Sequence, residues 1–270
     1  MPSNYAHYLF GEQLLPNLPC ELQKIIASDP QLYRIGQHGP DIIFYYRTFW
    51  PKSAAQIGFQ MHKQSGRAFF EHARDVIQCT QDHRLISYTL GFLCHFLLDC
   101  NCHTYVYQAL NHSRISHVEM ETEFDRMLML KQGKNPLTTN ATAHIAATRE
   151  HAKRIAQIFV PLTPEQIYEG IGSMKLVHRL LICPNASKRH TMRRLLRILH
   201  LEKSLGGFIV TPVANPLCQK SNQILYQLYQ RTLEDAVPIL TRYYSSIFTN
   251  APLGSWCDHT FQGKVILPLQ

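Results

Sequence analysis

The amino-acid sequence predicts an all-α protein, folded as a single multi-helix domain over residues 1–270. Apolar residues recur with a helical period along almost the whole chain, whereas alternating strand patterns are nearly missing. Hydrophobic residues occupy 45% of the positions, which suffices for a sizeable core and excludes a disordered chain. Because no internal repeat or low-complexity tract is present, we expect one fold rather than an array of modules.

Four helices are predicted in the first half of the chain, over residues 14–27, 57–76, 85–107 and 117–131. Pro16 and Pro19 interrupt the first of them near its start, because proline lacks the backbone donor of a helix interior. Two glycines are weak points in the second. The segment 36–40 contains two glycines and a proline, which predicts a turn before the short apolar run 42–46. Pro136 lies beyond the end of the fourth helix.

Four more helices are predicted over residues 141–159, 164–183, 187–203 and 221–248. Thr163 followed by Pro164 is a typical helix start, with a capping side chain and a proline in the first turn. Pro238 predicts a bend in the last helix. The loop 206–218 is the one hinge that the sequence offers, and we do not expect it to separate domains. From Asn250 onward the pattern is that of a loop.

The charge balance favours an anionic partner. Lys and Arg number 27 against 19 Asp and Glu, a net charge of +8, which would attract an anionic membrane surface or nucleic acid. The most basic stretch, 189–197, is interpreted first as a solvated helix face whose arginine stems cover the core, and only second as a lipid-binding patch. Any membrane contact is expected to be peripheral and to come from the helical domain itself.

The chain is expected to be cytoplasmic. No run of 18 apolar residues is present, so no membrane-spanning helix is predicted, and the most apolar window, 85–98, is interpreted as a buried core helix. The first residues show neither the basic region nor the apolar region of a secretory signal. In that compartment the eight cysteines would be reduced thiols.

Histidine is unusually frequent, with 15 residues against 13 glycines, which indicates metal or acid–base chemistry. In the predicted helix 85–107, His95, Asp99 and His103 are spaced by four residues and therefore share one face. An unpaired carboxylate on so apolar a helix would cost several kcal/mol, and a divalent cation would compensate for that cost.

The same spacing recurs in the predicted helix 117–131, where His117, Glu121 and Asp125 share a face. Glu119 and Glu123 point away from that face and are expected to be solvated. Zinc binds both imidazole nitrogen and carboxylate oxygen, and zinc helices present two ligands at this spacing. One such stripe is more often a surface ion pair or a buried histidine, but two stripes on consecutive helices favour a metal site.

Further donors lie upstream, and the order of the motifs is distinctive. The order is Ala-His-Tyr-Leu-Phe-Gly at 6–11 with His7, Gly-Pro-Asp-Ile at 39–42 with Asp41, His62, Gly-Phe-Leu-Cys-His-Phe-Leu-Leu-Asp at 91–99, and Ser-His-Val-Glu-Met-Glu at 116–121. Over about residues 1–130 this order resembles the zinc-dependent phospholipase C family. The resemblance implies an all-α fold with a zinc cluster in a cleft between helices, shared with secreted bacterial enzymes and single-strand-specific zinc nucleases.

The resemblance also implies which residues bind Zn²⁺, in two or three ions. It assigns Asp41, His62, His95 and Asp99 to one ion, His103, His117 and Glu121 to a second, and His7 with the bridging Asp99 to a third. The interval from Asp99 to His103 is shorter than in the secreted enzymes, so His112 is the alternative to His103.

The function that the resemblance implies is phosphodiester hydrolysis, with a phospholipid as the first candidate substrate. We expect a zinc-activated water to attack phosphorus in line, with Asp41 orienting or deprotonating that water. A nuclease or nucleotide phosphodiesterase on the same metals is the second hypothesis. A metal-binding or structural protein without catalysis is the third. Nothing in the sequence selects a head group, an oligomeric state or a role for residues 190–270.

Overall fold

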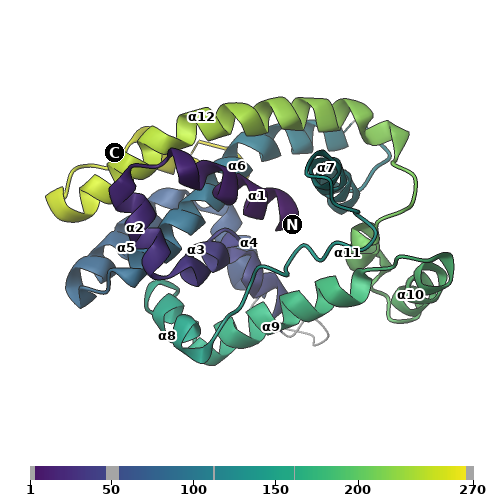
Figure 1. Cartoon of the computed structure of the whole chain (residues 1–270), viewed down its shortest axis with the longest axis horizontal. Helices are drawn as coiled ribbons and strands as arrows, with labels where there is room; N and C mark the ends of the chain where they lie inside the picture. The colour runs from purple at the N-terminus through teal and green to yellow at the C-terminus, as the bar shows by residue number, and fades with distance from the viewer. Residues whose placement is uncertain (1–3, 47–54, 112, 161, 266–270) are drawn as a thin grey trace.

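The computed structural model describes residues 4–46, 55–111, 113–160 and 162–265. Within these ranges the chain is built from helices, and it forms two isolated β-bridges but no strand, which confirms the all-α prediction (Figure 1). The α-helices are α1 (Asn4–Leu14), α2 (Cys20–Ser28), α3 (Pro30–Gly36), α4 (Ala55–Lys63), α5 (Gly66–Thr80), α6 (Arg84–Leu110), α7 (His117–Lys131), α8 (Arg149–Ile158), α9 (Pro164–Leu181), α10 (Ala186–Ile198), α11 (Glu202–Leu205) and α12 (Gln219–Thr249). The 3₁₀ helices are η1 (Leu15–Asn17), η2 (Gly39–Tyr45), η3 (Gly206–Phe208), η4 (Pro216–Cys218) and η5 (Ser255–Asp258).

Helix α6 is the central element of the fold. Helices α1, α2, α3 and α12 all pack against it, and α12 runs along one edge of the molecule in Figure 1. The most apolar 18-residue window of α6 is long and hydrophobic enough to cross a membrane, but 83% of it is buried inside the protein. Its hydrophobicity is therefore explained by packing, as predicted for residues 85–98.

Two glycines allow α3 to approach α6 closely. A Cβ at Gly36 would lie 2.2 Å from the carbonyl oxygen of Tyr88, and one at Gly91 would lie 2.1 Å from that of Tyr33. Both neighbours are backbone atoms, which have no room to yield. This contact fixes the turn that follows α3, and with it the position of Asp41 relative to the polar face of α6.

The predicted helices 85–107, 117–131, 164–183 and 221–248 are confirmed as α6, α7, α9 and α12. Thr163 caps α9 as expected, since its side chain accepts a hydrogen bond from the backbone N–H of Gln166. Helix α12 runs through Pro238 as one element. Two helices were not predicted, α1 and α3, because both are short and their apolar residues do not form a long periodic stretch.

Four predicted helices are shorter or divided. The range 14–27 begins with the last residue of α1, continues through η1, and becomes α-helical again only in α2, after Pro16 and Pro19. The range 57–76 is broken between α4 and α5, where Ser65 is extended and pairs with Thr260. Residues 141–148 are not helical, because α8 begins only after Thr148, whose side chain forms a capping box with His151. The range 187–203 divides into α10 and α11 at His200, which has a left-handed backbone with φ of 57°.

Buried apolar side chains form one cluster that draws on residues from α1 to the segment after α12. This continuous core is what a single domain requires. The single-domain organisation of residues 1–270 stays a prediction, supported by that core.

Candidate metal centre

Three groups of metal-ligand side chains lie beside one another among the described residues. Within each group the candidate ligand atoms lie within 4.8 Å of one another. The groups are Asp41, His62 and His95; His7, His95 and Asp99; and His103, His117 and Glu121. They bring together the eight residues that the resemblance assigns to zinc. Asp125, from the predicted stripe of His117 and Glu121, belongs to none of the groups, and the alternative His112 lies outside the described residues. The side chains come from α1, η2, α4, α6 and α7, so five separate elements converge on this point.

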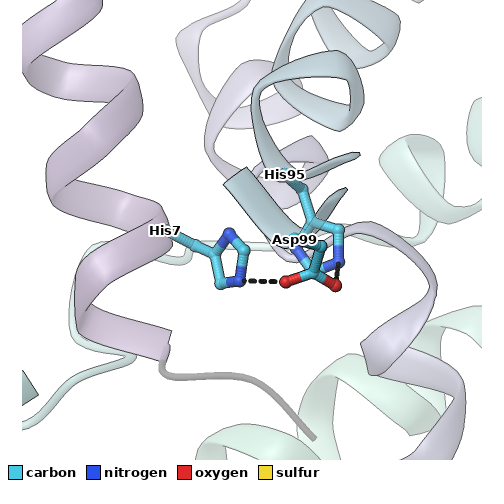
Figure 2. Close-up of side chains that lie close together, drawn as sticks. All are labelled: His7, His95 and Asp99. Carbon is cyan, nitrogen blue, oxygen red and sulfur yellow. Dashed lines mark ion pairs between the residues drawn. The ribbon is translucent and has the colours of Figure 1, made fainter. Parts of the chain in front are cut away.

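Asp99 lies at the centre of the site. One of its oxygens, Oδ1, is 3.1 Å from Nε2 of His7 and 3.6 Å from Nδ1 of His103. The other, Oδ2, is 3.2 Å from Nε2 of His95 and 4.0 Å from Nε2 of His62. Figure 2 shows the Asp99 carboxylate between His7 of α1 and His95 of α6. The carboxylate is therefore placed to contact more than one ion.

Asp41 is fully buried and faces two imidazoles. Its Oδ1 lies 3.1 Å from Nε2 of His62, and its Oδ2 lies 3.7 Å from Nε2 of His95. The turn that presents Asp41 requires Gly39, whose φ is +49° and whose added Cβ would lie 2.3 Å from the ring of His95. Glycine is favoured there both by the left-handed backbone and by the closeness of the imidazole.

The third group lies where α7 begins. The side chain of Ser116 caps this helix by accepting a hydrogen bond from the backbone N–H of Glu119. One turn further on, Oε1 of Glu121 lies 2.7 Å from Nε2 of His117 and 3.1 Å from Nε2 of His103. The predicted pairing of the two helical stripes is thus present in the structure, with His103 facing α7.

Backbone carbonyls orient three of the imidazoles. The Nδ1–H groups of His62, His95 and His103 donate to backbone oxygens at distances of 2.7, 3.2 and 2.8 Å. These oxygens belong to Gly58, Gln37 and Phe261. Such hydrogen bonds fix the tautomer and leave the Nε2 lone pair free for a metal. The contribution of Phe261 was not predicted, because it depends on a contact between the C-terminal segment and α6.

Two acidic residues of α7 have roles other than those expected. Asp125 shares the predicted face with Glu121, but its carboxylate accepts hydrogen bonds from the backbone N–H groups of Tyr5 (3.0 Å) and Ala6 (2.7 Å). It therefore anchors the first turn of α1, which carries His7. Glu123 was expected to be solvated; it is 4% exposed and accepts a hydrogen bond from the backbone of Asn215.

Burial and ion pairing oppose each other in the cluster. Burial raises the pKa of the Asp99 carboxyl, but the surrounding imidazoles, His103 foremost, lower it well below its usual value. The same balance, with His117 as the main partner, lowers the pKa of Glu121. Burial lowers the pKa of His103, yet Asp99 and Glu121 outweigh it and raise that pKa to about 9. For His7 burial dominates, and its pKa is lowered.

The donor set fits a metal cluster. Both carboxylate oxygens of Asp41, Oδ2 of Asp99, Oε2 of Glu121 and Nε2 of His95 are buried and form no hydrogen bond, since the close contacts among them given above lack hydrogen-bond geometry. Leaving such atoms unsatisfied costs about 1–3 kcal/mol each, and more when they are charged. Imidazole nitrogen and carboxylate oxygen are zinc ligands. Zn²⁺ bound among these residues would satisfy the same atoms.

A second buried polar network adjoins the cluster and was not predicted. His38 Nδ1 lies 2.9 Å from Oδ1 of Asn4, and His38 Nε2 lies 2.8 Å from Nε2 of His144. The Nδ2 atom of Asn4 lies 2.7 Å from Nε2 of His178. Asn4, His178 and Glu121 line a common cavity of about 50 Å³. The side of the centre near α9 thus offers neutral polar groups next to a candidate ligand.

Comparison with known proteins identifies one family. The family model for zinc-dependent phospholipase C matches residues 6–170. This range contains all eight candidate ligands, from His7 to Glu121. No curated protein and no solved structure matches the chain.

Proposed function

Because the chain belongs to the zinc-dependent phospholipase C family, we propose that it is a zinc-dependent phosphodiester hydrolase that acts on phospholipids. The family supports the reaction class, and the three groups of ligand side chains carry the proposal for this chain. Among the described residues, five elements distant in sequence bring histidine and carboxylate side chains together in three adjoining, largely buried groups. Burying these carboxylates would be costly without a cation.

We assign the ligands as the resemblance to the family implies. Asp41, His62, His95 and Asp99 would hold one Zn²⁺, His103, His117 and Glu121 a second, and His7 with Asp99 a third. The position of Asp99 between His7 and His95 supports a bridging role (Figure 2). The third ion has the fewest side-chain ligands, so we expect it to bind most weakly.

When bound, the zinc ions supply Lewis-acid activation of water and neutralise charge on the phosphate. Asp41 would orient the attacking water through a hydrogen bond and accept its proton as the new phosphorus–oxygen bond forms. The Asp41 carboxylate faces Nε2 of His62 at 3.1 Å and Nε2 of His95 at 3.7 Å, so the three side chains present their ligand atoms to a common point. Attack in line with the leaving alkoxide then breaks the bond between phosphorus and that oxygen.

The decisive experiment compares a chromogenic choline phosphodiester with single-stranded DNA as substrates of the zinc-loaded protein. We expect hydrolysis of the choline ester, and loss of at least about a hundredfold of that rate in Asp41→Asn, as is typical for a general base. Asp235→Asn is the matched control, because Asp235 is an exposed carboxylate on α12. Hydrolysis of DNA alone would instead assign a nuclease, and no hydrolysis of either substrate would contradict the enzymatic proposal.

A further inference from the structure

Helix α10 is attached to the protein by one face only. Among its side chains only Leu196 is fully buried, and Met192 packs beside it at the edge of the core. Arg189 donates to the carbonyl of Cys183 at 2.9 Å, and Arg193 pairs with Glu202 at 2.8 Å. In Figure 1, α10 lies at one end of the molecule, beyond the end of α9. These inward contacts leave the opposite face of the helix uncovered by the described residues.

The outward face combines apolar and cationic side chains. Leu195, Ile198 and Leu199 are 45%, 65% and 49% exposed. Arg194 and Arg197, which flank these residues, are also exposed. Among the ion pairs of the described residues, α10 takes part in one, and it is made by Arg193 on the inward side. The exposed arginines therefore have no acidic partner among those pairs.

We propose that α10 is a docking helix for an anionic phospholipid surface, an inference that rests on the proposed phospholipase function. Residues 186–199 contain five Lys or Arg residues and no Asp or Glu, whereas a solvated helix face commonly mixes both signs. Exposed aliphatic side chains next to cations are what an interfacial helix inserts among lipid head groups. Each cation near an anionic leaflet strengthens binding about fivefold.

The composition favours a lipid surface over nucleic acid. Proteins that bind single strands stack bases on aromatic side chains. Between residues 184 and 207 the chain contains no Phe, Tyr or Trp. The exposed face offers branched aliphatic side chains instead, which suit acyl chains and glycerol backbones better than bases.

Two cavities lie between the region of α10 and α7. Leu181 and Cys183, just before α10, line the same cavity as the candidate ligand Glu121. Arg193 lines a second cavity, of about 400 Å³, with Ser116 and Glu119 from the start of α7. These two cavities thus place the region of α10 beside α7, the helix that carries His117 and Glu121.

Co-sedimentation of the zinc-loaded protein with vesicles tests this proposal independently of activity. Vesicles of phosphatidylcholine with and without phosphatidylserine are compared, in short incubations on ice, at low and high salt. We expect binding to the vesicles that contain phosphatidylserine, weakened by salt. Arg194→Ser with Arg197→Ser should weaken it about 25-fold, fivefold for each arginine. Ile198→Ser with Leu199→Ser should weaken it about tenfold, because less apolar surface is buried among the lipids.

Arg231→Ser and Phe248→Ser are the matched controls, since both residues are exposed on α12, and they should bind vesicles like wild type. The α10 variants should hydrolyse a soluble short-chain phosphodiester at the wild-type rate. If neither wild type nor any variant hydrolyses this substrate, the proposed function is overturned. Vesicle binding is measured without hydrolysis, so its result decides the docking proposal separately. The docking proposal is overturned if wild type does not bind anionic vesicles, if it binds only single-stranded DNA, or if the α10 variants bind vesicles as tightly as wild type.

Discussion

The anchoring of α1 by Asp125 leads to a quantitative prediction about the third zinc site. The Asp125 carboxylate accepts hydrogen bonds from two backbone N–H groups, those of Tyr5 and Ala6, at the positive end of the helix dipole. A hydrogen bond to a charged group contributes about 1.5–3 kcal/mol, and deletion leaves both donors without this acceptor. We predict that Asp125→Ala lowers the free energy of unfolding by about 3–5 kcal/mol, since two such hydrogen bonds are lost.

The same substitution should affect metal content selectively. His7 lies in the first turns of α1, whereas the other candidate ligands belong to elements that Asp125 does not anchor. We therefore expect Asp125→Ala to lose the ion held by His7 and Asp99 and to retain the others. Asp125→Asn keeps one acceptor oxygen and should lose about half as much stability.

Urea denaturation and zinc content measured on the same samples provide the assay. Asp235→Ala is the control, because the Asp235 carboxylate is exposed and its ion pair with Arg231 is long, at 3.9 Å. It should change stability by less than about 0.5 kcal/mol. If Asp125→Ala were as stable as this control and held as much zinc as wild type, the anchoring of His7 by Asp125 would be wrong.

Three further predictions concern the apparatus around the cluster. Gly39→Ala should lower the free energy of unfolding by at least about 2 kcal/mol and weaken zinc binding, because the φ of residue 39 is positive and the new Cβ would meet the ring of His95. Gly172→Ala is the control: nothing lies within 4 Å of a Cβ at residue 172, so this variant should be neutral or stabilising in the same denaturation assay. Addition of Zn²⁺ to chelator-treated protein at pH 7 should release protons to an indicator dye, because the pKa of His103 is raised to about 9 and zinc binds only the neutral imidazole. Zinc binding without proton release would contradict this. The folded-state pKa of His103 lies above the ordinary value of about 6.5, so its contribution to stability is complete below pH 6.5 and is lost as the pH rises through 9. The free energy of unfolding of the metal-free protein should therefore fall by up to about 3 kcal/mol over that window, and His103→Gln should flatten this pH dependence. Equal pH slopes of the unfolding free energy for the two proteins would count against the ion pairs of His103.

The local part of the site could be predicted from the sequence. His95, Asp99 and His103 were placed on one face by a spacing of four residues, and the structure has them on one face of α6. Local spacing also placed His117 and Glu121 together at the start of α7. Such patterns hold because helix geometry alone decides which side chains are neighbours.

The long-range part could not be predicted in this way. The carbonyl of Phe261 and the buried network of His38, Asn4 and His178 depend on segments that meet only in the folded chain. For Asp125 the spacing predicted the helix face on which the side chain lies, but it could not predict that its hydrogen-bond partners are backbone amides of α1. Spacing determines where a side chain points, whereas tertiary contacts determine what it meets.

The broken helices have a similar cause. Residues near Ser65 and Thr148 have compatible helical periodicity on both sides. At Ser65 a β-bridge to Thr260 separates α4 from α5, and at Thr148 a capping box with His151 sets the start of α8. Propensity is a weak preference, and a specific hydrogen bond at one position overrides it.

Metal content by mass spectrometry, on protein purified without a histidine tag, tests the central claim most directly. Wild type should contain two or three zinc ions per chain. Asp99→Ala should contain fewer, because Asp99 contacts ligands of all three groups, and Asp235→Ala should match wild type. Less than half an equivalent of zinc in wild type, unchanged in Asp99→Ala and not restored by added Zn²⁺, would contradict the account and leave these residues as a buried polar network.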